Sequence, residues 1–94
     1  LEKYLHSLPR ARLTRSDPLS LVQIVDYQPN QVVVDVVLSS PNTLELADMM
    51  YPGWQAEIDG QSVPIKISAD SFRQVDIPTG NHQLTFLYNP LISN

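Results

Sequence analysis

The sequence predicts an all-β domain, a two-layer antiparallel β-sandwich of about seven short strands with immunoglobulin-like or jelly-roll-like topology. Apolar and polar residues alternate with a period of two along most of the chain, as they do in strands that bury one face. Clusters of Pro, Gly, Asn, Asp and Ser interrupt the alternation roughly every 8–12 residues, which is typical of sandwich turns. Because each strand has one apolar face, a second sheet is expected to cover it.

Residues 31–39 are the clearest strand of the sequence. Five valines lie in this stretch, and β-branched side chains favour strands. One face is fully apolar, whereas the other also carries Asp35 and Ser39. The residues expected to face the core are Val32, Val34, Val36 and Leu38. A turn at Pro29-Asn30 is expected to join this strand to a preceding one at 21–27.

Residues 51–60 form a predicted turn, strand and second turn. Pro52-Gly53 suits a type II turn with Gly53 at positive φ, and Asp59-Gly60 suits a two-residue hairpin. Between the turns, Trp54 alternates with polar neighbours and shares its face with other apolar residues.

The other predicted strands are less clear-cut. Residues 43–50 contain good helix formers, but their alternation and flanking turns favour a strand. Pro64 cannot donate a ladder hydrogen bond, so its strand is expected at an edge or at a bulge. A tight turn with Gly80 should precede the last strand. These remaining strands are expected at residues 11–15, 43–50, 61–68, 72–77 and 82–88.

The domain organisation divides the chain into an N-terminal arm or short helix at 1–10 and a single β-sandwich domain at 11–94. Leu1, Tyr4, Leu5 and Leu8 have helical spacing, and Pro9 would end such a helix. The chain starts at Leu1 without a methionine, so we expect it to be a piece of a longer protein.

Composition excludes several functions. The chain of 94 residues has no cysteine, so disulfides and thiolate metal sites are excluded. Its net charge is −4. Its acidic body argues against nucleic acid as a partner, which would require clustered cations. It has neither a Gly-rich phosphate loop nor a Gly-x-Ser-x-Gly elbow. We expect no cofactor, no metal and no catalytic residue.

Asp48 and His82 are the candidate polar site residues. Asp48 falls on the apolar face of its strand and needs a partner, expected to be Arg73 or the amides of the 51–53 turn. A structural role and a catalytic role both remain open for Asp48. His82 is interpreted as a rim histidine bonded to a turn, with a metal ligand or base as the alternative.

Tyr51 and Trp54 are the candidate aromatic residues. Exposed aromatic rings beside a turn can stack on sugar rings, whereas buried rings belong to the core. Trp54 is expected in the core because of its neighbours, and Tyr51 fits either role. Glu57 and Asp59 share a strand face, as the acids of a glycosidase would, but both are expected to be solvated.

Several short motifs together resemble the C-terminal segment of YfhO-type bacterial membrane proteins, which are polytopic and glycosyltransferase-C-like. They cover most of residues 8–90, although the link at 12–20 is shorter than in the family pattern. The motifs are Leu8-Pro9-Arg10-Ala11, Tyr27-Gln28-Pro29-Asn30, Tyr51-Pro52-Gly53-Trp54, Asp59-Gly60, Val63-Pro64-Ile65, Phe72-Arg73, Pro78 with Gly80-Asn81-His82, and Phe86 with Tyr88 and Pro90.

This resemblance implies a non-catalytic domain at the extracytoplasmic face of a bacterial membrane. The parent protein would use polyprenyl-phosphate-linked sugars, and its catalytic acids would lie in the membrane portion. The expected partners are that membrane portion, on which the domain would pack, and envelope glycan, which it would help to present. A stand-alone carbohydrate-binding module is the first alternative and a small hydrolase the second. The expected binding residues are Asp48, Tyr51, Trp54, Arg73 and His82; the expected turn residues are Pro52, Gly53, Asp59, Gly60 and Gly80.

Overall fold

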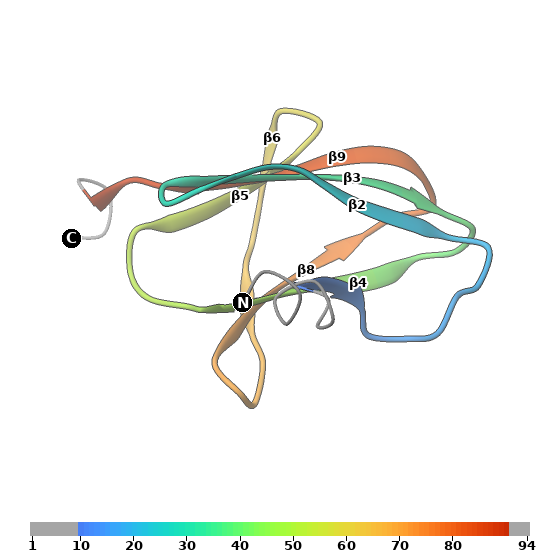
Figure 1. Ribbon diagram of the computed structural model, residues 1–94, viewed down its shortest axis with the longest axis horizontal. Helices are drawn as coiled ribbons and strands as arrows, with labels where there is room; N and C mark the ends of the chain where they lie inside the picture. Colours follow the sequence, from blue (N-terminus) through green and yellow to red (C-terminus); the bar gives the residue numbers. More distant parts are fainter. Residues whose placement is uncertain (1–9, 91–94) are drawn as a thin grey trace, which may run out of the picture.

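The protein is a two-layer β-sandwich, as the sequence predicts. The structure is a computed structural model that describes residues 10–90, in which nine β-strands and no α-helix are found. The strands form two antiparallel sheets that lie face to face (Figure 1). The arm or short helix expected at residues 1–10 lies almost entirely outside the described residues.

The larger sheet has five strands and contains the predicted strand at 31–39. Its second strand pairs with the first through the turn at Pro29-Asn30, as expected. In spatial order the strands are β2 (Leu21–Gln28), β3 (Gln31–Leu38), β9 (Gly80–Tyr88), β5 (Trp54–Ile58) and β6 (Gln61–Val63).

The smaller sheet has four strands and covers the apolar face of the larger one. In spatial order they are β1 (Ala11–Leu13), β4 (Asn42–Met49), β8 (Phe72–Ile77) and β7 (Lys66–Ile67). The strand predicted at 43–50 is therefore confirmed, and its helical alternative is wrong. Tertiary burial overrides the helix propensity here, because Leu44 and Leu46 are both fully buried against the other sheet.

The last strand holds the larger sheet together. β9 lies between β3 and β5 and pairs with both, so it joins the β2–β3 hairpin to the β5–β6 hairpin. Leu84 and Phe86 on this strand are completely buried. Most of the larger sheet therefore depends on contacts between residues far apart in the sequence.

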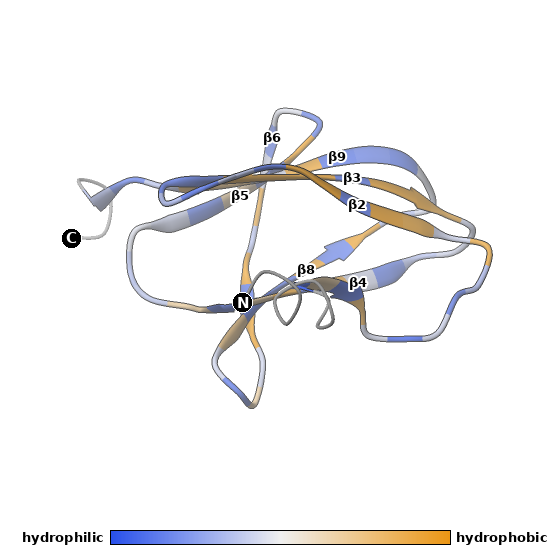
Figure 2. Cartoon of the chain, viewed as in Figure 1, coloured by the Kyte–Doolittle hydropathy of each residue, from blue (hydrophilic) through white to orange (hydrophobic). Residues whose placement is uncertain are grey.

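The core fills the space between the sheets. Alternation along β3 buries one face, as the sequence predicts, and Figure 2 shows apolar and polar residues following one another along the strands. The buried apolar residues are Val32, Val34, Val36, Leu38, Leu44, Leu46, Trp54, Ala56, Val75, Ile77, Leu84 and Phe86.

The single strand predicted at 61–68 is wrong. β6 ends at Val63 and β7 begins at Lys66, and the two strands are at the edges of different sheets. Pro64 has no N–H with which to continue the β6 ladder, so the chain leaves the larger sheet there. The edge position expected for this proline is confirmed, but the strand does not continue beyond it.

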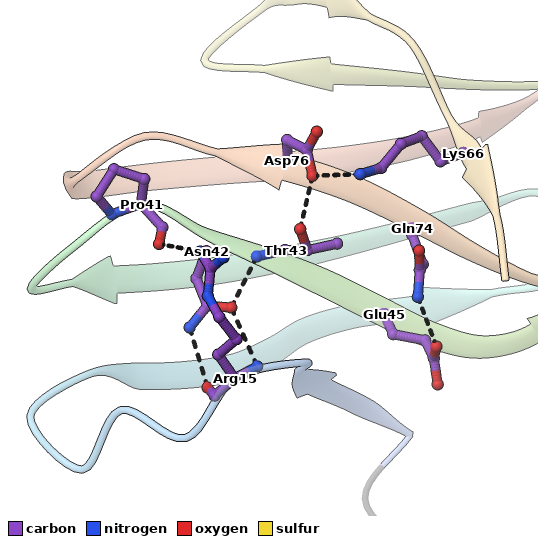
Figure 3. A network of polar contacts seen from close by, with 8 residues as sticks. All are labelled: Arg15, Pro41, Asn42, Thr43, Glu45, Lys66, Gln74 and Asp76. Carbon is purple, nitrogen blue, oxygen red and sulfur yellow. Dashed lines mark hydrogen bonds and ion pairs between the residues drawn. The ribbon is translucent and has the colours of Figure 1, made fainter.

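Polar contacts link β4 of the smaller sheet to its neighbours. The buried amide of Asn42 donates to the Arg15 carbonyl at 3.0 Å and accepts from the backbone N–H of Thr43 at 2.8 Å (Figure 3). Glu45 is also buried, because Arg12 and Gln74 cover it and bond to its two oxygens. Arg12 bonds to β4 through Glu45, and Arg15 bonds to the preceding turn through the carbonyl of Pro41.

Candidate functional site: the Trp54 pocket

The turn before β5 has the geometry expected from its Pro-Gly pair. Gly53 has a φ of 107°, which is strongly unfavourable for residues with a Cβ. A Cβ on Gly53 would lie 2.6 Å from Cε1 of Tyr88, so the Tyr88 ring also leaves no room for a side chain at this position. The backbone N–H of Asn89 donates to the Gly53 carbonyl at 2.7 Å. This turn is therefore fixed directly against the end of β9.

Three aromatic rings meet at this turn. Tyr51, Trp54 and Tyr88 pack with centroid separations of 6.2, 5.4 and 5.3 Å, which are typical of favourable aromatic pairs. Trp54 is 7% exposed, so its predicted core position is confirmed. Tyr51 is 47% exposed, so part of its ring faces solvent beside the buried indole.

A pocket of about 340 Å³, hereafter the Trp54 pocket, opens at this end of the sandwich. The β2–β3 turn, the β4–β5 connection and the end of β9 gather there, on the left in Figure 1. Its lining includes Tyr27, Asp48, Met49, Tyr51, Trp54 and Arg73. Four of the five binding residues suggested by the sequence therefore lie in one pocket.

Arg73 is the unusual residue of this pocket. It is 3% exposed, and its guanidinium carbon lies 3.6 Å from the centroid of the Trp54 ring. One nitrogen, Nη2, donates to the carbonyl of Met49 at 3.2 Å. Nε and Nη1 are buried without a hydrogen-bond partner among the described residues, as is Nε1 of Trp54. Burial lowers the pKa of Arg73, and nearby Asp48 opposes that change.

The partners expected for Asp48 are wrong. Its Oδ1 accepts from Nη1 of Arg10 at 2.6 Å, and its Oδ2 accepts from the Tyr27 hydroxyl at 2.8 Å. The Arg10 guanidinium also lies over the Tyr27 ring, 4.6 Å from its centroid. β4 is irregular between Leu46 and Met49, which places Asp48 where strand alternation alone does not determine its neighbours.

Sequence reasoning missed Arg10 and Tyr27 as neighbours of this pocket. Arg10 belongs to the Leu8-Pro9-Arg10-Ala11 motif and Tyr27 to the Tyr27-Gln28-Pro29-Asn30 motif, so both were visible only as parts of the resemblance. Burial and the hydrogen bond to Asp48 raise the pKa of Tyr27, in that order of size. The Tyr27 phenol therefore remains protonated and donates to the carboxylate.

His82 lies apart from the Trp54 pocket, near the start of β9, and it bonds to turns as expected. Its Nδ1 is 2.7 Å from Oδ2 of Asp59, and its Nε2 is 3.0 Å from the carbonyl of Thr79. Both partners are acceptors, so both contacts are satisfied only when the ring carries two protons. The bond to Asp59 accordingly raises the pKa of His82, and the same bond lowers the pKa of Asp59.

Asp59 lies in the turn of the β5–β6 hairpin, as expected. Asp59 has a φ of 51° and Gly60 a φ of 86°, as expected for the two central residues of this hairpin turn. The second oxygen of Asp59 accepts from the backbone N–H of Gln83 at 2.8 Å. Within residues 10–90 no group of three or more His, Cys, Asp and Glu side chains is placed to hold a metal ion.

In comparisons with known proteins, no protein-family model, curated protein or solved structure matches the chain. In the part of the chain that the structure describes, no helix has the length and apolar character that crossing a membrane requires.

Proposed function

We propose that this domain is a non-catalytic glycan-binding β-sandwich of a larger YfhO-type membrane protein, and that it presents acceptor glycan at the extracytoplasmic face of the membrane. The observation that carries the binding part is the Trp54 pocket, where a half-exposed tyrosine ring lies beside buried polar groups. The membrane context comes from the ordered motifs described above.

The chemistry of the pocket suits a sugar. A sugar ring has an apolar C–H face, which stacks on aromatic rings, and a rim of hydroxyl groups, which need donors and acceptors. The exposed part of the Tyr51 ring offers the stacking surface. Tyr27, Asp48 and Arg73 line the same pocket and offer polar groups. Its volume of about 340 Å³ lies within the range of small-ligand sites.

The engagement of the titratable groups supports the non-catalytic part of the proposal. Both carboxylate oxygens of Asp48 accept hydrogen bonds, from Arg10 and from Tyr27. Both ring nitrogens of His82 contact acceptors in turns, far along β9 from the pocket. Neither group presents an unengaged base toward a substrate.

Packing on the membrane portion is the second role, and an apolar surface favours it. Leu19, Leu21 and Val37 are 80%, 67% and 40% exposed, and Leu21 is directly opposite Val37 in the β2–β3 pair. Exposed apolar residues grouped in this way are typical of contact surfaces. A stand-alone carbohydrate-binding module would need no such contact.

Nuclear magnetic resonance tests the binding part. Neutral tetrasaccharides of glucose and of N-acetylglucosamine, added up to millimolar concentration, should shift the signals of Tyr51 and of the Trp54 indole N–H. Shifts confined to the His82 end, or no shifts with any sugar, would contradict glycan binding in the pocket. The parent reading frame tests the membrane part: hydrophobic spans are expected in it, and a frame without them would favour a stand-alone module.

A further inference from the structure

We propose that the Trp54 pocket selects glycans that carry a negatively charged group, a carboxylate or a phosphate on the sugar, and that Arg73 is the residue that binds this group. The proposal rests on the function proposed above and specifies its ligand. It follows from the charges around the pocket, from the unsatisfied nitrogens of Arg73 and from the side chains at the pocket opening.

The charges around the pocket leave an excess positive charge. Arg10 and Asp48 form an ion pair at 2.6 Å, and the second oxygen of Asp48 is bonded to the Tyr27 hydroxyl. The acidic group of the pocket is thereby largely neutralised. Arg73 has no ion pair among the described residues and bonds only to a neutral carbonyl. Two guanidinium groups thus face one carboxylate, and an anion entering the pocket would meet a cation that has no direct ion pair and only the nearby charge of Asp48 to balance it.

The unsatisfied nitrogens of Arg73 are an independent indication. Buried polar groups in proteins are nearly always hydrogen-bonded, and a charged group buried without partners is especially unfavourable. Nε and Nη1 of Arg73 and Nε1 of Trp54 are buried donors without acceptors in residues 10–90. All three belong to residues that line the same pocket. A carboxylate or phosphate supplies several acceptors at once and forms strong charge-assisted bonds with a guanidinium.

The cation is fixed in position before any ligand binds. Stacking on the Trp54 ring at 3.6 Å and the bond to the Met49 carbonyl hold the guanidinium plane. Met49 and Tyr51, which are 60% and 47% exposed, line the same pocket. Tyr51 is held by its ring contacts with Trp54 and Tyr88. The proposal therefore requires a rotamer change of the exposed Met49 side chain to open the way to the guanidinium.

The experiment compares three probes on the same protein by the NMR signals of the Trp54 indole N–H and of the Arg73 Nε–H. The probes are a trimer of galacturonic acid, the matched neutral trimer of galactose, and galactose 6-phosphate. We expect the galacturonic acid trimer to bind about tenfold or more tightly than the matched neutral trimer at low salt, which is the effect of one charge-assisted hydrogen bond. The preference should shrink as the salt concentration rises.

Two arginine variants separate a local effect from a general effect of charge. Arg73→Met removes the guanidinium but keeps an unbranched apolar side chain similar to the arginine stem, and it should abolish the preference for the charged sugars. Arg12→Met makes the same change at an exposed arginine outside the pocket and should leave the preference unchanged. If Arg73→Met does not fold, the wild-type protein tests the role of Arg73: its Nε–H signal should shift with the charged probes and not with the neutral trimer.

Each outcome has a different meaning. Equal binding of charged and neutral sugars would overturn the role of Arg73 while leaving glycan binding intact. Binding of inorganic phosphate, added as a fourth probe, without binding of any sugar would contradict the glycan proposal and the sugar specificity together. No shift of either reporter signal with any probe would also overturn both. A shift of the Arg73 Nε–H signal with galactose 6-phosphate would support recognition of a phosphate as well as a carboxylate.

Discussion

Replacing Gly53 by alanine should destabilise the protein far more than replacing Gly60, although both glycines have positive φ. Gly53 has a φ of 107° and Gly60 a φ of 86°, so the backbone cost is similar, about 1–2 kcal/mol for a residue with a Cβ. The surroundings differ. A Cβ on Gly60 has no atom within 4 Å, whereas a Cβ on Gly53 lies 2.6 Å from the Tyr88 ring.

The clash at Gly53 adds a packing cost. Tyr88 is held by the aromatic cluster and by the bond from its backbone N–H to the carbonyl of Asn30 at 2.9 Å, so its ring cannot simply move away. Overpacking of this kind costs about 1–3 kcal/mol. Gly53→Ala should therefore lose about 2–5 kcal/mol of unfolding free energy, and Gly60→Ala about 1–2 kcal/mol.

Urea unfolding followed by tryptophan fluorescence measures both variants. Trp54 is the single tryptophan and is buried, so its emission reports unfolding of the region next to Gly53. A double variant with Tyr88→Ala removes the ring that meets the new Cβ, and it should show a coupling of about 1 kcal/mol or more. Equal losses for the two glycine variants, or no coupling with Tyr88, would refute the reasoning.

Three further predictions concern single side chains. Trp54→Ala should cost about 3–5 kcal/mol, measured by urea unfolding with circular dichroism, and a loss below about 1 kcal/mol would contradict its core position. Arg10→Gln should lower the free energy of unfolding by about 1 kcal/mol or less at low salt, and by less at high salt, because Arg10 is partly exposed and salt screens its pair with Asp48. A loss of stability that does not depend on salt would argue against the ion pair. The pKa of His82, measured by NMR titration, should lie above the ordinary 6.5 and fall toward it in Asp59→Asn. The stability that this pair contributes is then complete below pH 6.5 and is lost as the pH rises through the pKa of the folded state. An unchanged pKa of His82 in Asp59→Asn would contradict the contact.

Local patterns in the sequence predict most of the fold because alternation and turn chemistry act over a few residues. The period-two pattern of β3 selects the buried face, and the strand predicted at 43–50 follows from the same rule. Asp59-Gly60 predicts its hairpin because both residues tolerate positive φ.

The sequence pattern does not predict which distant strands pair or which distant side chains meet. The alternation on both sides of Pro64 is consistent with one strand, and only the position of the two sheets makes β6 and β7 separate. Arg10 meets Asp48 because β1 pairs with β4, which alternation within either strand cannot predict. The grouping of the candidate site residues has the same origin, since Trp54 and Arg73 face each other from different sheets.

The most direct measurement for the Trp54 pocket is the set of intermolecular nuclear Overhauser effects between the protein and the bound galacturonic acid trimer. The account predicts contacts from the sugar C–H protons to the rings of Tyr51 and Trp54, which line the pocket. Contacts to the exposed face around Leu21, or to the Asp59–His82 hairpin end, would contradict it.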